Sequence, residues 1–260
     1  RGSTVLSIWC GINFILALII LCYVIVLKQN SPILQVASFS EAEIEGLGAK
    51  TIAAPKGILE DPAAWKLLEQ IDYDFSKLHV PNGTRSTVVL RAKKIDSVVR
   101  DFLARHPDGV VLHLGCGLDT RFTRVDNGRV IWYDLDLPAV IDLRAKFFEQ
   151  TPRYRMLASS ASDMKWIEQV QAASKPVLVA AEGLMMYLRE ADVKALIAGL
   201  RAAFPDCELV FDAFSALTAR RVGAHPSLKK TGALIHWGID DPLEIESWAP
   251  GLRLKEEWFF

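Results

Sequence analysis

Short apolar runs alternate with helical patterns in the second half of the chain, and this alternation constrains the fold more than any other feature. The runs expected to form strands are Val110–Leu114, Val130–Leu135, Tyr154–Leu157, Val177–Ala181 and Glu208–Phe211. Helical patterns between them cover Pro138–Phe148, Asp163–Ala173 and the segment around Val193–Leu200. Strands that alternate with helices pair in parallel and carry helices on both faces of the sheet. The sequence therefore predicts an α/β fold with a doubly wound, mostly parallel sheet.

Two further helices are expected before the first of these strands. Asp61 is a good N-cap with Pro62 at the first helical position, which predicts a helix that runs to about Ile71. Apolar residues recur at helical spacing from Ser86 to Arg105, where the sequence HPDG stops the pattern.

The first predicted strand ends in the sequence LGCGLDT, which places Gly115 and Gly117 at the turn where open α/β sheets bind ligands. A dinucleotide fingerprint would have a third glycine where this chain has Thr120, and no Gly-Lys-Ser/Thr follows as a phosphate-binding loop requires. Asp119 would repel a pyrophosphate but tolerates a ligand with a sulfonium and an ammonium group. These features favour S-adenosylmethionine as the cofactor.

Acidic residues follow the second predicted strand in the sequence YDLDLP, about twenty residues after the glycines. A carboxylate at this place accepts hydrogen bonds from both ribose hydroxyls of a nucleotide-like cofactor. Asp134 and Asp136 are both candidates for this contact, and the spacing alone does not choose between them.

Several separated motifs resemble the leucine carboxyl methyltransferase family, and most closely its tetracenomycin-type polyketide O-methyltransferase branch. They are VVLHLGCGLDTR, YDLDLP, PVLVAAEGLMMYL, GILEDPAAWKLLEQIDYDF and WGIDDPLEIESWAPGLRL, and the similarity covers roughly Gly48 to Phe260. The resemblance implies a class I, Rossmann-like methyltransferase fold. It also implies transfer of a methyl group from S-adenosylmethionine to a carboxylate or another oxygen of a small molecule.

The resemblance also assigns cofactor contacts to residues of this chain. It places Gly115 under the methionine part of the cofactor, Asp136 on the ribose, Arg91 on the cofactor carboxylate and Glu182 near its amino group. Ser160 and Ala161 match the family's adenine position without its acidic residue, so Asp163 is expected to take part there.

The expected reaction needs few catalytic groups, because a carboxylate is already a nucleophile at neutral pH. Arg121 and Tyr187 are the candidates for orienting the acceptor oxygen. A phenol would need a general base, for which His236 is the first candidate. No cluster with metal-ligand spacing is present, so no metal is expected.

The formal net charge of −1 and the absence of a Lys/Arg-rich block argue against a nucleic-acid partner. Two alternatives to a methyltransferase remain open at this point. One is an NAD(P)-dependent oxidoreductase with the same fold, and the other is a non-catalytic, membrane-tethered protein that binds S-adenosylmethionine.

An uncharged stretch of 23 residues, Val5–Leu27, is long enough to cross a bilayer as a helix. We expect a hydrophobic transmembrane anchor in residues 1–28, a linker in 29–48 and the methyltransferase domain in 49–260. The catalytic domain would then lie on the cytoplasmic side of a membrane, and the alternative is a soluble cytoplasmic enzyme.

The last predicted strand, Leu252–Phe260, lacks a second strand beside it in the nearby sequence. A class I methyltransferase sheet has seven strands, so we expect an open sheet edge with Leu252–Phe260 poorly paired or displaced toward the fifth strand. We also expect the natural protein to continue beyond residue 260.

Overall fold

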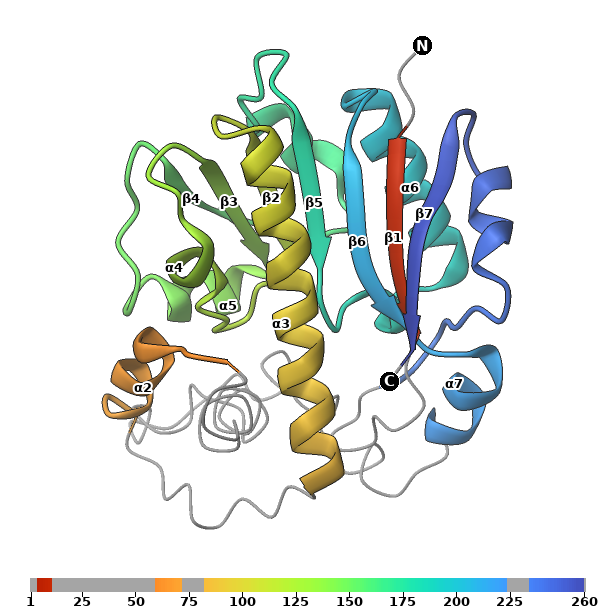
Figure 1. Cartoon of the computed structure of the whole chain (residues 1–260), viewed down its shortest axis with the longest axis horizontal. Coiled ribbons are helices and arrows are strands. Elements are labelled where there is room, and N and C mark those ends of the chain that lie inside the picture. The colour runs from red at the N-terminus through yellow and green to blue at the C-terminus, as the bar shows by residue number, and fades with distance from the viewer. Residues whose placement is uncertain (1–3, 11–58, 72–81, 224–233, 260) are drawn as a thin grey trace.

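The computed structural model describes residues 4–10, 59–71, 82–223 and 234–259. They form one seven-stranded sheet in the order β4-β3-β2-β5-β6-β1-β7, in which every neighbouring pair is parallel (Figure 1). The strands are β1 (Thr4–Cys10), β2 (Val110–Leu114), β3 (Ile131–Asp136), β4 (Tyr154–Ala158), β5 (Val177–Ala181), β6 (Glu208–Ala213) and β7 (Leu252–Phe259). The predicted doubly wound α/β fold is confirmed.

Helices cover both faces of the sheet, with α3 across the front and α6 behind in Figure 1. The α-helices are α2 (Pro62–Leu68), α3 (Asn82–Arg105), α4 (Arg121–Val125), α5 (Pro138–Arg144), α6 (Glu190–Ala203) and α7 (Ala216–Gly223). Short 3₁₀ helices are η3 (Met164–Gln169), η4 (Met185–Tyr187) and η5 (Pro242–Ser247). One apolar core lies between α3 and the sheet, and a larger core lies between the sheet and α6, η3 and η5.

The five strands predicted from apolar runs are all present, and each differs from its expected bounds by no more than two residues at either end. The helix predicted over Asp163–Ala173 is instead the six-residue η3, which buries only Trp166. The chain leaves the helical conformation at Val170, the extended C-cap of η3, although Ile167 and Val170 also pack against the core. Asp163 does cap η3, because its side chain accepts a hydrogen bond from the Lys165 N–H.

The expectation of a transmembrane helix over Val5–Leu27 is wrong at its start, because Thr4–Cys10 forms β1 between β6 and β7. An uncharged run suits the middle of a parallel sheet as well as it suits a bilayer, which is why the sequence pattern misled. Residues 11–27, the predicted 29–48 linker and the predicted domain start at residue 49 lie outside the described residues. No helix in the described part of the chain is both long and apolar enough to span a membrane.

The expectation of an open sheet edge with Leu252–Phe260 poorly paired or displaced toward the fifth strand is also wrong. β7 pairs with β1 along its whole length, from Leu252 opposite Thr4 to Phe259 opposite Cys10, with one irregularity after Leu6. The seventh strand thus comes from the N-terminal residues and is parallel to its neighbours.

The carboxyl ends of the strands lie along the lower edge of the sheet in Figure 1, and α2 lies beside this edge. Apolar residues of α2 pack against Leu118, which follows β2, and against Leu143 of α5. This packing brings the predicted glycine turn, the acids at the carboxyl end of β3 and the N-terminus of α2 into one region.

Candidate active site

The turn after β2 is built on two glycines with left-handed backbones. Gly115 has φ +64° and Gly117 has φ +49°, conformations that other residues adopt only with strain. A Cβ atom at Gly115 would lie 3.2 Å from the Leu184 side chain. At Gly117 it would meet no heavy atom within 4 Å, so this peptide faces open space in the described part of the structure. A ligand can therefore approach the backbone at Gly117.

Asp136, the last residue of β3, is joined directly to this turn. Its carboxylate accepts hydrogen bonds from the Gly117 N–H at 2.8 Å and from the Leu137 N–H at 2.7 Å. Burial raises the pKa of Asp136 to about 6, although these two hydrogen bonds act in the opposite direction. The carboxylate is thus ionised at neutral pH and held at the turn.

Asp134 lies two residues earlier and is enclosed by protein donors. Its Oδ1 accepts from His113 Nδ1 at 3.0 Å and from Trp132 Nε1 at 2.8 Å, and its Oδ2 contacts Arg144 and the Tyr154 hydroxyl. Burial alone would raise the pKa of Asp134, but the Arg144 charge and these hydrogen bonds lower it to about 2. Its position favours a role in holding the scaffold, with Asp136 nearer to the open turn.

Arg144, at the end of α5, connects Asp134 to the glycine turn. Its guanidinium donates to the carbonyl of Gly117 at 2.9 Å and to that of Asp119 at 2.7 Å. Its Nη2 also lies 2.6 Å from Asp134 Oδ2. Because the arginine is completely buried, this planar group fixes the turn relative to β3.

Glu182 follows β5 directly and is paired with two arginines from different helices. Its Oε1 accepts from Arg91 Nε of α3 at 2.9 Å, and its Oε2 forms a close ion pair with Arg121 Nη2 of α4. Arg91 Nη1 also donates to Asp212 near the end of β6 at 2.7 Å, and Asp212 accepts from the Gly183 N–H. The carboxyl ends of β5 and β6 are therefore linked through Arg91.

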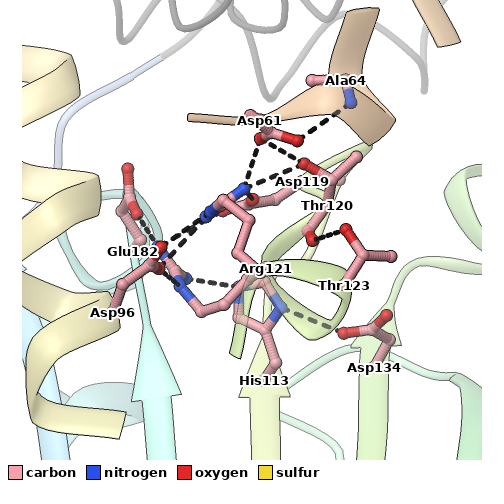
Figure 2. A network of polar contacts seen from close by, with 12 residues as sticks. Asp61, Ala64, Asp96, His113, Asp119, Thr120, Arg121, Thr123, Asp134 and Glu182 are labelled. Atoms are coloured by element: carbon pink, nitrogen blue, oxygen red, sulfur yellow. Dashed lines mark hydrogen bonds and ion pairs between the residues drawn. The ribbon is translucent and has the colours of Figure 1, made fainter. Parts of the chain in front are cut away.

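Arg121 of α4 lies in the centre of the ionic network drawn in Figure 2, and Arg124 of the same helix shares two of its partners. Both contact Asp96 of α3, at 2.8 Å from Arg121 Nε and 2.7 Å from Arg124 Nε. Both also pair with Asp119 of the turn, at 3.3 and 2.9 Å. Arg124 additionally donates to Asp61, the N-cap of α2, at 2.6 Å. The network thus joins α2, α3, α4 and the turn.

Among the described residues, the buried charges at this edge are unbalanced. In this part of the chain, seven buried carboxylates and four buried guanidiniums gather at the carboxyl ends of the strands: Asp61, Asp96, Asp119, Asp134, Asp136, Glu182 and Asp212 with Arg91, Arg121, Arg124 and Arg144. An excess of buried negative charge favours a ligand that brings positive groups. The sulfonium and ammonium groups of S-adenosylmethionine fit this requirement.

The remaining predicted site residues lie near the same edge of the sheet. Ser160, Ala161 and Asp163 follow β4, where the Ser160 side chain accepts from the Ser162 N–H and Ala161 is buried. Tyr187 ends η4 and is half-buried against an apolar cluster. His236 is exposed, and its backbone N–H donates to Met186.

A family model for leucine carboxyl methyltransferases matches residues 46–201 of this chain. The chain belongs to the leucine carboxyl methyltransferase family. It is also 42% identical over 205 residues to the tetracenomycin polyketide synthesis O-methyltransferase TcmP of Streptomyces glaucescens, and the match covers 78% of this chain and 76% of that protein. As a member of this family, the chain is an S-adenosylmethionine-dependent O-methyltransferase, and S-adenosylmethionine is its cofactor.

A second relative is the S-adenosyl-L-methionine-dependent methyltransferase dpfgK of Gibberella zeae, 29% identical over 233 residues, covering 81% of this chain and 78% of that protein. Among solved structures, the magnesium protoporphyrin IX methyltransferase of Synechocystis PCC 6803 matches with a TM-score of 0.44 and 15% identity, over 72% of this chain and 82% of that one. The oxidoreductase and non-catalytic alternatives receive no support from these comparisons.

The residues of the candidate site that the sequence did not predict are those that hold other site residues in place. Asp96, Arg124, Arg144 and Asp212 touch predicted site residues or the turn, yet none stands in a recognisable motif. The only sequence signal was Asp212, a charged residue inside the otherwise apolar part of β6. Asp96, Arg124 and Arg144 lie in helices that carry other charged residues. Among the described residues no group of three or more His, Cys, Asp or Glu side chains is arranged to hold a metal ion.

Proposed function

We propose that this enzyme methylates a carboxylate of a small aromatic molecule of the polyketide type. The relative that shares 42% of its residues acts in tetracenomycin polyketide synthesis as an O-methyltransferase, which supports the acceptor class. The choice of a carboxylate rests on the chemistry of the site.

The single observation that carries this choice is the state of His113. It is the one fully buried histidine among those that the structure describes, and both of its ring nitrogens are engaged, with Asp134 and Arg121. It therefore has no lone pair to offer an acceptor, and His106 and His236 lie outside the charged network. A phenol needs a base to become a good nucleophile, whereas a carboxylate does not. Among the described residues, no histidine of the charged network is available as that base, which supports an acceptor that arrives already ionised.

The cofactor site that we propose is formed by the open glycine turn and the charged residues around it. Asp136 would accept the ribose hydroxyls, and Glu182 would face the amino group, with Arg91 near the cofactor carboxylate. Further neighbours of the cofactor in this proposed site would be Asp119, Ser160, Ala161 and Asp163. When bound, S-adenosylmethionine supplies an electrophilic methyl group on a positively charged sulfur.

The protein's own contribution to the reaction is positioning. Methyl transfer is an in-line displacement, so rate comes mainly from holding the acceptor oxygen in line with the methyl carbon. Of the two residues expected to orient the acceptor, Tyr187 is half-buried beside the carboxyl end of β5, whereas the Arg121 guanidinium is enclosed by protein groups. Tyr187 is therefore the better candidate for contacting the acceptor.

A methyl-release assay tests the proposed chemistry. The purified chain is incubated with methyl-labelled S-adenosylmethionine and an aromatic polyketide that bears both a carboxylate and phenols. A methyl ester releases labelled methanol in mild alkali, and a phenol ether does not, so we expect volatile label. The matched control is the same polyketide with its carboxylate converted to a carboxamide, which should accept no label. Alkali-stable label, or equal labelling of the carboxamide, would show that a hydroxyl is the acceptor.

A further inference from the structure

His113 lies in the middle of the sheet between two charged groups, of which one only donates hydrogen bonds and the other only accepts them. It is the fourth residue of β2, is 1% exposed, and stands in register with Asp134 of β3. Its Nδ1 lies 3.0 Å from Asp134 Oδ1, and its Nε2 lies 2.9 Å from Arg121 Nη1. Both contacts are visible in Figure 2.

These two partners determine the tautomer of the ring. A guanidinium can only donate hydrogen bonds, so Nε2 must carry its lone pair toward Arg121. An ionised carboxylate can only accept, so Nδ1 must carry the hydrogen toward Asp134. An imidazolium would place an N–H against an N–H of Arg121. Burial and the Arg121 charge accordingly lower the pKa of His113.

The guanidinium of Arg121 is in turn held on every side. Nε donates to Asp96 at 2.8 Å, Nη1 to His113 at 2.9 Å, and Nη2 faces Glu182 and Asp119. Because the group is planar, the contacts with Asp96 and His113 on two of its nitrogens fix the direction of the third. That direction is toward the Glu182 carboxylate.

Glu182 is the group whose placement depends most on this arrangement. It follows β5 without an intervening residue, and its two oxygens are held by arginines of two separate helices, Arg91 of α3 and Arg121 of α4. Loss of either arginine contact would let the carboxylate rotate. In the proposed function this carboxylate faces the amino group of the cofactor.

We infer that His113 is a positioning residue for cofactor binding: as a neutral ring with its hydrogen on Nδ1, it accepts from Arg121 and thereby fixes the Glu182 carboxylate. The inference rests on the proposed placement of the cofactor amino group at Glu182. It gives His113 a defined effect on one part of the ligand, the amino acid end, and none on the nucleoside end.

Two substitutions separate the two hydrogen bonds of the ring. His113→Asn keeps an amide donor near the Nδ1 position for Asp134 but removes the acceptor for Arg121. His113→Gln places an amide oxygen near the Nε2 position, where it can accept from Arg121. Calorimetry on folded, full-length variants would use two probes, S-adenosylhomocysteine and methylthioadenosine, of which the second lacks the amino acid end.

We expect His113→Asn to weaken S-adenosylhomocysteine binding about tenfold, in line with the loss of about one hydrogen bond to a charged group when Glu182 is no longer held toward the ligand. Its affinity for methylthioadenosine should stay within about twofold of wild type, and His113→Gln should recover most of the lost affinity. Equal losses for both probes, equal behaviour of the two variants, or no loss at all would overturn the inference. A purely structural role would weaken both probes together.

Two further measurements complete the test. Imidazole nitrogen chemical shifts should show His113 protonated on Nδ1 only, and a ring protonated on Nε2 would overturn the inference. Glu182→Gln should weaken S-adenosylhomocysteine selectively. Unchanged binding in Glu182→Gln would overturn the proposed cofactor placement and the inference with it. A loss in Glu182→Gln without one in His113→Asn would overturn the inference alone.

Discussion

At the scale of single residues, Asp136 is the acid whose protonation should alter cofactor affinity. Burial raises the pKa of Asp136 to about 6, and the ionised carboxylate is the form that would accept two ribose hydroxyls in the proposed site. Protonation as the pH falls through 6 removes one acceptor oxygen from this contact. We therefore expect S-adenosylmethionine to bind about tenfold more weakly at pH 5 than at pH 8, when measured by calorimetry.

Asp136→Asn supplies the control for this dependence. The amide cannot titrate, so its binding should be weak and nearly constant between pH 5 and 8. A wild-type affinity that stays flat over the same range would show that Asp136 does not hold the ribose. The contrast with Asp134 is instructive, because its pKa of about 2 keeps it ionised throughout.

At the scale of elements, Asp61 at the start of α2 holds this helix beside the glycine turn. Asp61 Oδ1 accepts from the Ala64 N–H at 2.9 Å, and its Oδ2 pairs with Arg124 and Thr120. Asp61→Ala removes both the cap and the ion pair, whereas Asp61→Asn keeps a capping oxygen and removes the charge. We expect amide exchange in α2 to accelerate in both variants, and about five- to tenfold more in Asp61→Ala, because a cap contributes about 1 kcal/mol.

Hydrogen exchange followed by mass spectrometry on the segment 62–68 measures this difference. Amides of β2, which lie in the middle of the sheet, serve as the internal reference and should not change. Equal exchange of α2 in the two variants would mean that the ion pair with Arg124, and not the cap, holds the helix.

A helix or strand could be predicted from the sequence when its residue pattern is complete within its own short segment. The buried strand Val177–Ala181 was predicted to the residue, because a short apolar run bounded by polar residues has few other solutions. The five-residue α4, with the sequence RFTRV, was missed because it is too short and too polar to show a helical period. The helix predicted over 163–173 was too long, because the chain leaves the helical conformation at Val170 although apolar residues on both sides of that point lie in or against one core.

The same distinction explains which residues of the candidate site could be predicted from the sequence. Gly115, Gly117 and the pair Asp134 and Asp136 could be placed at one edge of the sheet from the sequence, because the turn and the strand end are local patterns with a known spacing. Asp212 was not found, because its contact with Arg91 joins residues 121 positions apart and exists only once α3 lies across the sheet. Pairings of this kind come from tertiary packing, and a single sequence contains no local trace of them.

At the scale of the whole molecule, the sheet depends on a strand that is distant in sequence from its neighbours. β1 lies between β6 and β7, with Ile8 opposite Phe211 on one side and Glu257 on the other. Among the strands of the described residues, β1 is the only neighbour of β7. Loss of β1 pairing would therefore leave β7 without a ladder and β6 with a new edge.

Ile8→Pro tests this dependence, because proline removes a backbone donor in the middle of a sheet. We expect the free energy of unfolding in urea to fall by about 1–3 kcal/mol, the cost of leaving buried backbone groups unpaired. Amide protection should drop in β7 and stay unchanged in β4 at the opposite edge. Ile8→Val keeps the backbone donor and should retain wild-type protection in both strands. If β7 amides exchange equally slowly in Ile8→Pro and Ile8→Val, residues 4–10 do not supply the strand that holds β7 in the sheet.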